Sequence, residues 1–157
     1  MKRVIAFILG CILMLSQGIS VFAENTEDFS KFEMIETDQS FTNGSENQVS
    51  PNLLYIADIL TYIAKVSSNQ VGIQGDVVCS TKVKSIKLTC TLQKKSGTKW
   101  VDAASKTTTT YDVDGTHKSY IISKVSSGTY RCKASALVTD YNGYSESLTG
   151  YSSSIST

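Results

Sequence analysis

The stretch Ile86-Lys87-Leu88-Thr89-Cys90-Thr91-Leu92 decides the fold. Its apolar and polar residues alternate strictly, which predicts a β-strand with one buried face. The same alternation recurs over residues 130–138, and a shorter version covers residues 71–77. Together these runs predict a domain built from β-strands.

Further short strands are expected at residues 54–66, 99–101, 106–111, 119–122 and 144–151, although residues 54–66 also admit a short helix. Lys95-Ser96-Gly97-Thr98 predicts a tight turn. Asn142-Gly143 predicts a type I′ hairpin turn, because both central residues of that turn need a positive φ. About seven short strands separated by such turns predict an immunoglobulin-like antiparallel β-sandwich.

The first 23 residues have the layout of a secretory signal peptide. Lys2 and Arg3 precede an apolar run that ends near Leu15, and the small or weakly polar residues that follow end at Ala23. The run is shorter than the roughly 20 residues of a spanning helix. A lipoprotein-type cleavage box at Cys11 is the alternative. We expect cleavage after Ala23, no transmembrane segment after it, and a secreted, extracellular protein that can associate with the cell surface.

Charge divides the rest of the chain at Pro51, the only proline. Residues 24–50 hold seven acidic side chains and one lysine, a net charge of −6. Residues 51–157 hold eleven lysines and Arg131 against seven acidic side chains, a net charge of +5, although the whole chain carries only +1. The acidic leader, residues 24–50, is expected to be disordered, and a short helical turn around residues 29–35 is the alternative. Residues 51–157 then form the single β-sandwich domain.

The run Ser127-Gly128-Thr129-Tyr130-Arg131-Cys132 resembles the sixth-strand motif of immunoglobulin-like domains. In that motif a tyrosine two residues before a cysteine forms a tyrosine corner, so the resemblance implies that the Tyr130 hydroxyl bonds the backbone upstream. A wider pattern adds Leu92-Gln93-Lys94-Lys95-Ser96-Gly97-x-x-Trp100 and Ser145-Glu146-Ser147. It is similar to a family of small secreted proteins of Gram-positive bacteria with a domain of unknown function. That resemblance implies export and an all-β fold, and no particular reaction.

Removal of the signal peptide leaves Cys79, Cys90 and Cys132, an odd number in an oxidising compartment. Cys90 and Cys132 belong to the buried sets of strands expected to be antiparallel neighbours. Cys79 is offset from Cys132 by roughly 20 Å along its strand, which is too far for a bridge. We therefore predict the disulfide Cys90–Cys132. The alternative is that both are free thiols that act as small buried hydrophobic residues.

No motif demands catalysis. His117 is the single histidine, and a zinc site with Asp112 and Asp114 is disfavoured because Asp-x-Asp-Gly is more typical of a turn. Neither a Gly-x-Ser-x-Gly elbow nor a pair of carboxylates suited to glycoside hydrolysis is apparent. We expect no enzyme, no cofactor and no metal.

Two surfaces are candidate binding sites. Outward residues Lys87, Arg131 and Lys133 predict a basic stripe that could attract an anionic cell-wall polymer, a glycan or the acidic leader itself. Tyr141 and Tyr144 flank the expected hairpin turn, where aromatic side chains either serve recognition or pair across strands. A plain solvated face is the more ordinary interpretation of the stripe. Nucleic acid is not expected, because the basic residues lack a clustered aromatic platform.

These features predict a secreted, non-enzymatic β-sandwich that acts as an extracellular or cell-surface binding module. A small secreted effector, toxin-like in its action on neighbouring cells, is the alternative.

Overall fold

The computed structural model describes residues 28–42 and 53–157. The signal peptide, Cys11 and Pro51 lie outside these residues. In chain order the described elements are a 3-10 turn η1 (Phe29–Lys31) and the strands β1 (Glu33–Thr37), β2 (Ile56–Ser67), β3 (Gln70–Ser96), β4 (Lys99–Ser123), β5 (Thr129–Thr139), β6 (Ser145–Tyr151) and β7 (Ile155–Ser156). Among them, no helix is long and apolar enough to cross a membrane.

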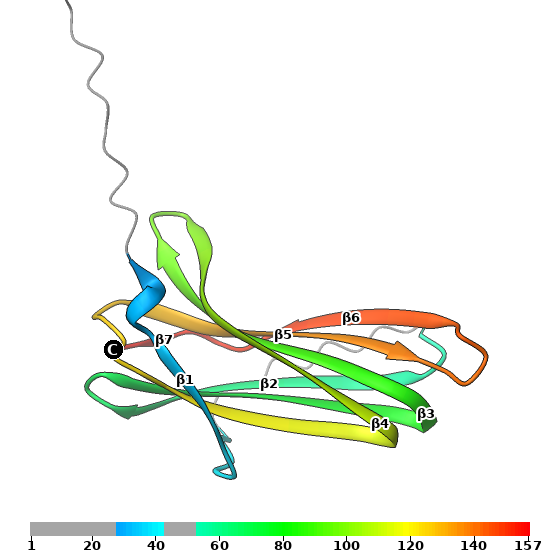
Figure 1. The fold of residues 1–157 in the computed structure, drawn as a ribbon. Helices are drawn as coiled ribbons and strands as arrows, with labels where there is room; N and C mark the ends of the chain where they lie inside the picture. The colour runs from blue at the N-terminus through cyan, green and yellow to red at the C-terminus, as the bar shows by residue number, and fades with distance from the viewer. Residues whose placement is uncertain (1–27, 43–52) are drawn as a thin grey trace, which may run out of the picture.

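Two long strands, β3 and β4, connect the two layers of the fold (Figure 1). Residues 70–79 of β3 pair with β2 on one side and with the second half of β4 on the other. After a register shift between Val78 and Val83, the rest of β3 pairs with the first half of β4 and with β5. β6 and β7 pair with β5, and every pairing is antiparallel. The predicted all-β antiparallel sandwich is confirmed.

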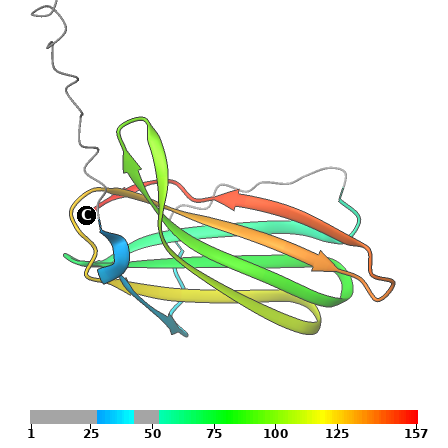
Figure 2. The same cartoon turned by 45° about the horizontal axis from the view of Figure 1, so that its top comes forward.

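The strand boundaries differ from the sequence prediction at the bend between the layers. The predicted strands at residues 71–77 and 86–92 are two halves of β3, and three predicted strands merge into β4. Ser80, Thr81 and Lys82 at the bend are exposed and polar, which is the pattern of a loop. The backbone nevertheless stays extended there, so one strand passes from one layer into the other (Figure 2).

The core lies between the layers and contains the residues that the alternation predicted. Ile86, Leu88, Cys90 and Leu92 are each at most 1% exposed, and so are Tyr130 and Val138 on β5. The Tyr130 hydroxyl donates to the carbonyl oxygen of Ser126 at 2.9 Å, which is the contact of a tyrosine corner. Hydrophobic burial of this kind is the main stabilising contribution to a small domain.

The two predicted hairpin turns have different outcomes. Ser96 pairs with Lys99 across a two-residue loop in which Gly97 has a φ of 58°, as a tight turn requires. The type I′ turn at Asn142-Gly143 is wrong, because Gly143 has a positive φ of 88° and Asn142 does not. Hydrogen bonds from Gly143 N to Asp140 O and from Asp140 N to Tyr144 O enclose a three-residue loop instead. Glycine at the last loop position is typical of that longer turn.

The predicted disulfide Cys90–Cys132 is wrong, and Cys79, Cys90 and Cys132 are buried free thiols. β3 and β5 are antiparallel neighbours as predicted, but Cys90 pairs with Ala134 and Cys132 pairs with Leu92. This diagonal relation separates Cα atoms by roughly 7–8 Å, beyond the reach of a disulfide. Burial raises the pKa of Cys90 to about 12 and that of Cys79 to about 11.

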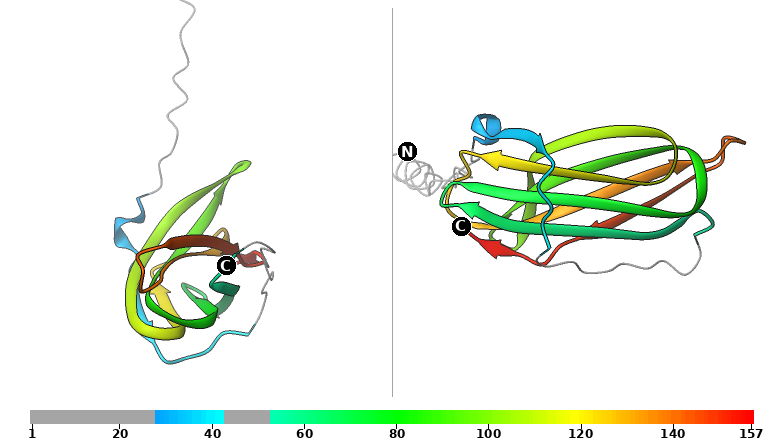
Figure 3. Two further views of the ribbon diagram at one scale, coloured as in Figure 1. Left: turned by 90° about the vertical axis from the view of Figure 1, so that its right-hand side faces the viewer. Right: turned by 90° about the horizontal axis from the view of Figure 1, so that it is seen from below.

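Part of the acidic leader forms regular structure, in contrast to the disorder expected from its composition. β1 pairs with the end of β4, from Glu33 opposite Ser123 to Thr37 opposite Ser119. The following residues cross the outer face of β4 and β3 (Figure 3, right). We call residues 33–42 the strap. Met34 and Phe41 of the strap pack against the sandwich, whereas Ile35 is exposed, so the leader sequence alone shows no periodic buried face.

A buried carboxylate holds the start of β2 against β6. Glu146 on β6 is 7% exposed and accepts hydrogen bonds from three consecutive backbone N–H groups. These are the N–H groups of Leu54 at 3.0 Å, Tyr55 at 2.7 Å and Ile56 at 2.5 Å. A buried charge is tolerated only when it is hydrogen-bonded in this way. Glu146 therefore fixes the position at which the chain enters the sandwich.

Candidate binding face

Hydroxyl side chains line the outer surface of the β4-β3-β5-β6 layer. Its hydroxyls form bridges between adjacent strands at Thr89–Thr107 (2.8 Å), Thr91–Ser105 (3.1 Å), Ser135–Thr149 (2.9 Å) and Thr139–Ser145 (2.9 Å). Threonine suits this position because its branched side chain packs well on a pleated surface. We call this surface the hydroxyl face.

A cation held between two aromatic rings lies at one end of the hydroxyl face. The guanidinium carbon of Arg131 is 4.4 Å from the centroid of the Trp100 ring and 4.2 Å from that of Tyr151. The strand register explains the contact. Arg131 pairs with Gln93. Trp100 pairs with the residue of β3 two positions after Gln93, and Tyr151 pairs with the residue of β5 two positions after Arg131, so the three side chains lie on the same face. Such cation–π contacts are stabilising and orient the planar guanidinium group.

Hydrogen bonds through Gln93 to Asp102 hold the guanidinium group in place. Arg131 Nε donates to Gln93 Oε1 at 2.7 Å, and Gln93 Nε2 donates to Asp102 Oδ1 at 2.6 Å. Lys133 Nζ lies 3.9 Å from the other oxygen of Asp102. Among the described residues, the side-chain hydrogen bonds of Arg131 involve Nε alone. The two terminal nitrogens of the guanidinium thus remain for a ligand.

The predicted basic stripe is only partly brought together. Arg131 and Lys133 share the Asp102 network, but Lys87 lies farther along the face, opposite Leu137. Lys87 lies six positions along β3 from Gln93, the partner of Arg131, a distance of about 20 Å. Sequence reasoning missed Trp100 and Tyr151 as members of the site, because their contact with Arg131 depends on the pairing of four strands.

The predicted tyrosine pair at the β5–β6 hairpin is not a cross-strand pair. Tyr141 is 58% exposed and donates to Asp112 Oδ1 at 2.5 Å. Asp112 also forms an ion pair with Lys82 at 2.8 Å. The backbone of Asp112 has a φ of 59° at the bend of β4. The hydrogen bond to Asp112 raises the pKa of Tyr141. Tyr141 therefore ties the hairpin tip to the bend.

Tyr144 makes a separate contact at the same end of the sandwich. Its ring centroid is 6.1 Å from that of Tyr55, whose hydroxyl donates to Asp140 Oδ2 at 2.8 Å. Asp140 Oδ1 also accepts from the backbone N–H groups of Asn142 and Tyr144. Both tyrosines are thus engaged in holding the hairpin, which favours a structural role for them.

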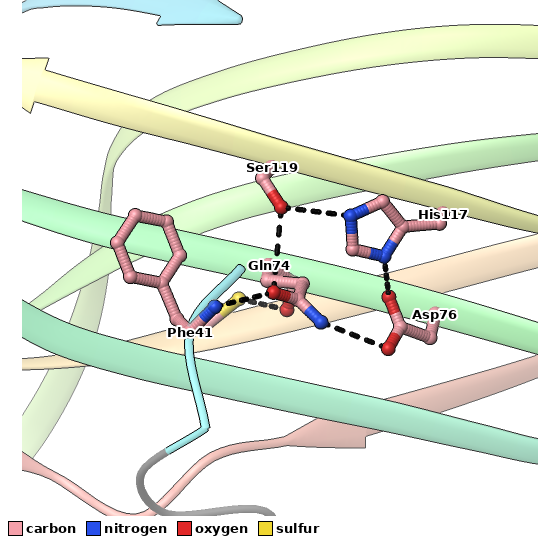
Figure 4. Close-up of polar contacts among 6 residues, drawn as sticks. Phe41, Gln74, Asp76, His117 and Ser119 are labelled. Carbon is pink, nitrogen blue, oxygen red and sulfur yellow. Dashed lines mark hydrogen bonds and ion pairs between the residues drawn. The ribbon is translucent and has the colours of Figure 1, made fainter. Parts of the chain in front are cut away.

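The most connected polar cluster was not found from the sequence. His117 Nδ1 lies 2.6 Å from Asp76 Oδ1, and His117 Nε2 lies 3.2 Å from the Ser119 hydroxyl (Figure 4). Gln74 closes the ring by donating to Asp76 Oδ2 at 2.9 Å and accepting from Ser119 at 3.4 Å. The members face each other because Asp76 pairs with His117 and Gln74 with Ser119. Only the strand register reveals this.

Asp76, His117 and Ser119 have the contacts of a hydrolase triad, but the strap buries the serine while His117 stays half exposed. Ser119 is 1% exposed, and the Phe41 N–H donates to Gln74 Oε1 at 2.7 Å beside it. A catalytic serine must reach a substrate carbonyl and needs free donors for the oxyanion. We therefore interpret the cluster as the base on which the strap is seated.

The described residues contain no group of three or more metal-ligating side chains. His117 contacts Asp76 rather than Asp112 or Asp114. No protein-family model and no curated protein matches the chain. The similarity to a secreted Gram-positive family therefore stays a prediction. The fold and the face define an antiparallel β-sandwich with a half-buried aromatic and cationic site on one face.

Proposed function

We propose that this protein is an extracellular, non-catalytic binding module whose ligand is an anionic, hydroxyl-rich polymer of a cell surface. One observation carries the proposal: the Arg131 guanidinium is held between Trp100 and Tyr151 at the end of the hydroxyl face. An oriented guanidinium offers parallel donors to a carboxylate or phosphate group. Aromatic edges and strand hydroxyls beside it suit the sugar or polyol units that carry such groups.

Charge and shape also support this ligand class. The whole-domain charge does not decide the attraction, because the −6 of residues 24–50 offsets the +5 of residues 51–157, but Arg131 and Lys133 place positive charge at the face itself. The hydroxyl face follows the strands from Arg131 towards Lys87, a distance of about 20 Å that several repeating units of a polymer can span. A face that follows the strands suits an extended chain, whereas a small molecule needs a concave pocket.

Binding of three soluble polymers tests the proposal by calorimetry: polygalacturonate, a glycerol-phosphate polymer and a neutral glucan of similar length. We expect one or both anionic polymers to bind and the neutral glucan to bind at least about tenfold more weakly, since a charge-assisted hydrogen bond contributes about 1.5–3 kcal/mol. The two anionic polymers distinguish carboxylate from phosphate recognition.

Substitutions on the same face provide the matched controls. Arg131→Ala should weaken binding about tenfold or more, and Arg131→Lys should weaken it nearly as much, because lysine keeps the charge but loses the planar fork. Lys87→Ala removes an equal charge from the far end and should change affinity by no more than about threefold, as expected for a screened surface charge. Equal losses for Arg131→Ala and Lys87→Ala, or no binding to any polymer, would refute the proposal.

A further inference from the structure

The loop that joins β5 to β6 carries the dipeptide Asn142-Gly143 and projects from one end of the sandwich (Figure 3, right). Both residues are exposed. Gly143 has a φ of 88°, and a Cβ built on it would meet no atom within 4 Å apart from its chain neighbours. No other described element therefore crowds the peptide bond between the asparagine and the glycine.

An asparagine side chain places an electrophilic carbon beside the backbone nitrogen of the next residue. When a base removes the proton of that nitrogen, the nitrogen attacks Cγ, a succinimide ring closes, and the side-chain nitrogen leaves as ammonia. Water then opens the ring at either carbonyl and gives aspartate or isoaspartate. The net reaction consumes water and releases ammonia, and it needs no oxidant or cofactor. A following glycine favours ring closure because its backbone is the least restricted.

Asn69 is the other asparagine that the structure describes, and its surroundings differ. It is also exposed, but the next residue, Gln70, begins β3 and pairs with both β2 and β4. Two strand pairings thus fix the backbone that would have to attack, and the Gln70 side chain adds bulk beside it. The N–H of Gly143 instead donates to Asp140 O at 3.3 Å, which is longer than the usual limit of about 3.2 Å.

We propose that Asn142 is a site of spontaneous deamidation, and that the new carboxylate loosens the β5–β6 hairpin. Asp140 is 5% exposed, and its carboxylate accepts from the Asn142 side-chain amide at 3.3 Å. Deamidation replaces this donor with a second carboxylate, and like charges at such a distance repel each other. Isoaspartate also lengthens the main chain of the loop. Both effects weaken the hydrogen bonds of Asp140 with Tyr55 and Tyr144, and the proposal is independent of the polymer ligand.

Tryptic mapping of the whole chain after incubation at mildly alkaline pH tests the reaction. The second Asn-Gly pair of the sequence, Asn43-Gly44, lies outside the described residues and serves as the reference for the sequence effect alone. Asn142, Asn69 and Asn43 fall in separate tryptic peptides, residues 134–157, 66–82 and 32–65. Deamidation raises the peptide mass by the difference between OH and NH₂.

Sampling continues until most of the Asn43 peptide is modified. We expect Asn142 to be converted at least about tenfold faster than Asn69, because only Asn142 precedes an unrestricted glycine. Equal rates at Asn142 and Asn69, or an unmodified Asn142 at the end of sampling, would overturn the assignment of the site.

Two variants test the consequence for the hairpin. Asn142→Asp adds the charge of the product, whereas Asn142→Ser removes the amide without adding a charge. The Tyr144 amide should exchange its hydrogen at least about tenfold faster in Asn142→Asp than in the wild type, and within about threefold of the wild type in Asn142→Ser. The deamidated wild-type chain should show the same loss of protection as Asn142→Asp. Unchanged exchange in Asn142→Asp, or equal effects of the two variants, would overturn the proposed loosening.

Discussion

Substitution of Gly72 by alanine tests how the strap is held. A Cβ at this position would lie 2.2, 2.3 and 2.7 Å from three atoms of the Phe41 ring, which is closer than real Cβ contacts. Phe41, which is 4% exposed, must therefore leave its place beside Gly72 and lose most of its burial. Full burial of such a side chain is worth about 1.5–3 kcal/mol, and alanine recovers about 0.5 kcal/mol by restricting the unfolded chain. We expect the free energy of unfolding to fall by about 2 kcal/mol.

A double-mutant cycle separates this effect from a general disturbance of β3. Phe41→Ala alone should cost about 3 kcal/mol, and the double variant should cost about 3 kcal/mol rather than about 5, because the second change finds the ring already gone. Urea unfolding followed by circular dichroism gives the three values. Hydrogen exchange should also become faster at the β1 amides in each variant. A cost of less than about 0.5 kcal/mol for Gly72→Ala, or additive costs, would refute this packing of Phe41.

Three further predictions concern the thiols and the carboxylate clamp. In the folded, unreduced protein Cys79, Cys90 and Cys132 should react slowly with a thiol reagent at pH 8, and all three should react after denaturation; a missing thiol would contradict the free-thiol structure. Burial raises the thiol pKa of Cys90 to about 12, so the unfolded state releases its proton first as the pH rises above about 9. The free energy of unfolding should therefore decrease between pH 9 and 12, and a smaller decrease in Cys90→Ala would identify this thiol as a cause. Glu146→Ala leaves three backbone N–H groups without their acceptor and should lower the free energy of unfolding by about 3 kcal/mol or more. The control Glu36→Ala removes only a partly exposed ion pair and should lower it by about 0.5 kcal/mol. Similar values for the two variants in urea unfolding would contradict the role of Glu146 in holding the start of β2.

The sequence predicts the parts of the fold that depend on local alternation. Residues 86–92 and 130–138 show which side chains are buried, because each strand has one face on the core and the other in solvent. The continuity of β3 and β4 through the bend was not predictable in this way. Exposed polar residues at the bend have the composition of a loop although their backbone stays extended.

Features that depend on register could not be read from the sequence. Cys90 and Cys132 are on neighbouring strands and on the same face, yet an offset of two residues separates the thiols. The same limitation applies to His117, whose partner Asp76 lies 41 residues earlier in the chain. β1 depends on a partner more than 80 residues away, so the leader's own composition indicates disorder. Arg131 was a candidate from its charge, whereas its aromatic neighbours required the structure.

The most direct test of the binding face is a residue-by-residue map of the ligand in solution. A ¹⁵N-labelled sample of the chain is titrated with the anionic polymer that binds best, in short oligomers, and amide shifts are followed by NMR. The largest shifts should fall on the Trp100 indole N–H, on the backbone around Arg131 and Lys133, and on Tyr151, and they should decrease towards Lys87. Shifts centred on Tyr141 and Tyr144, or on the strap, with no change at Trp100 would contradict the proposed face.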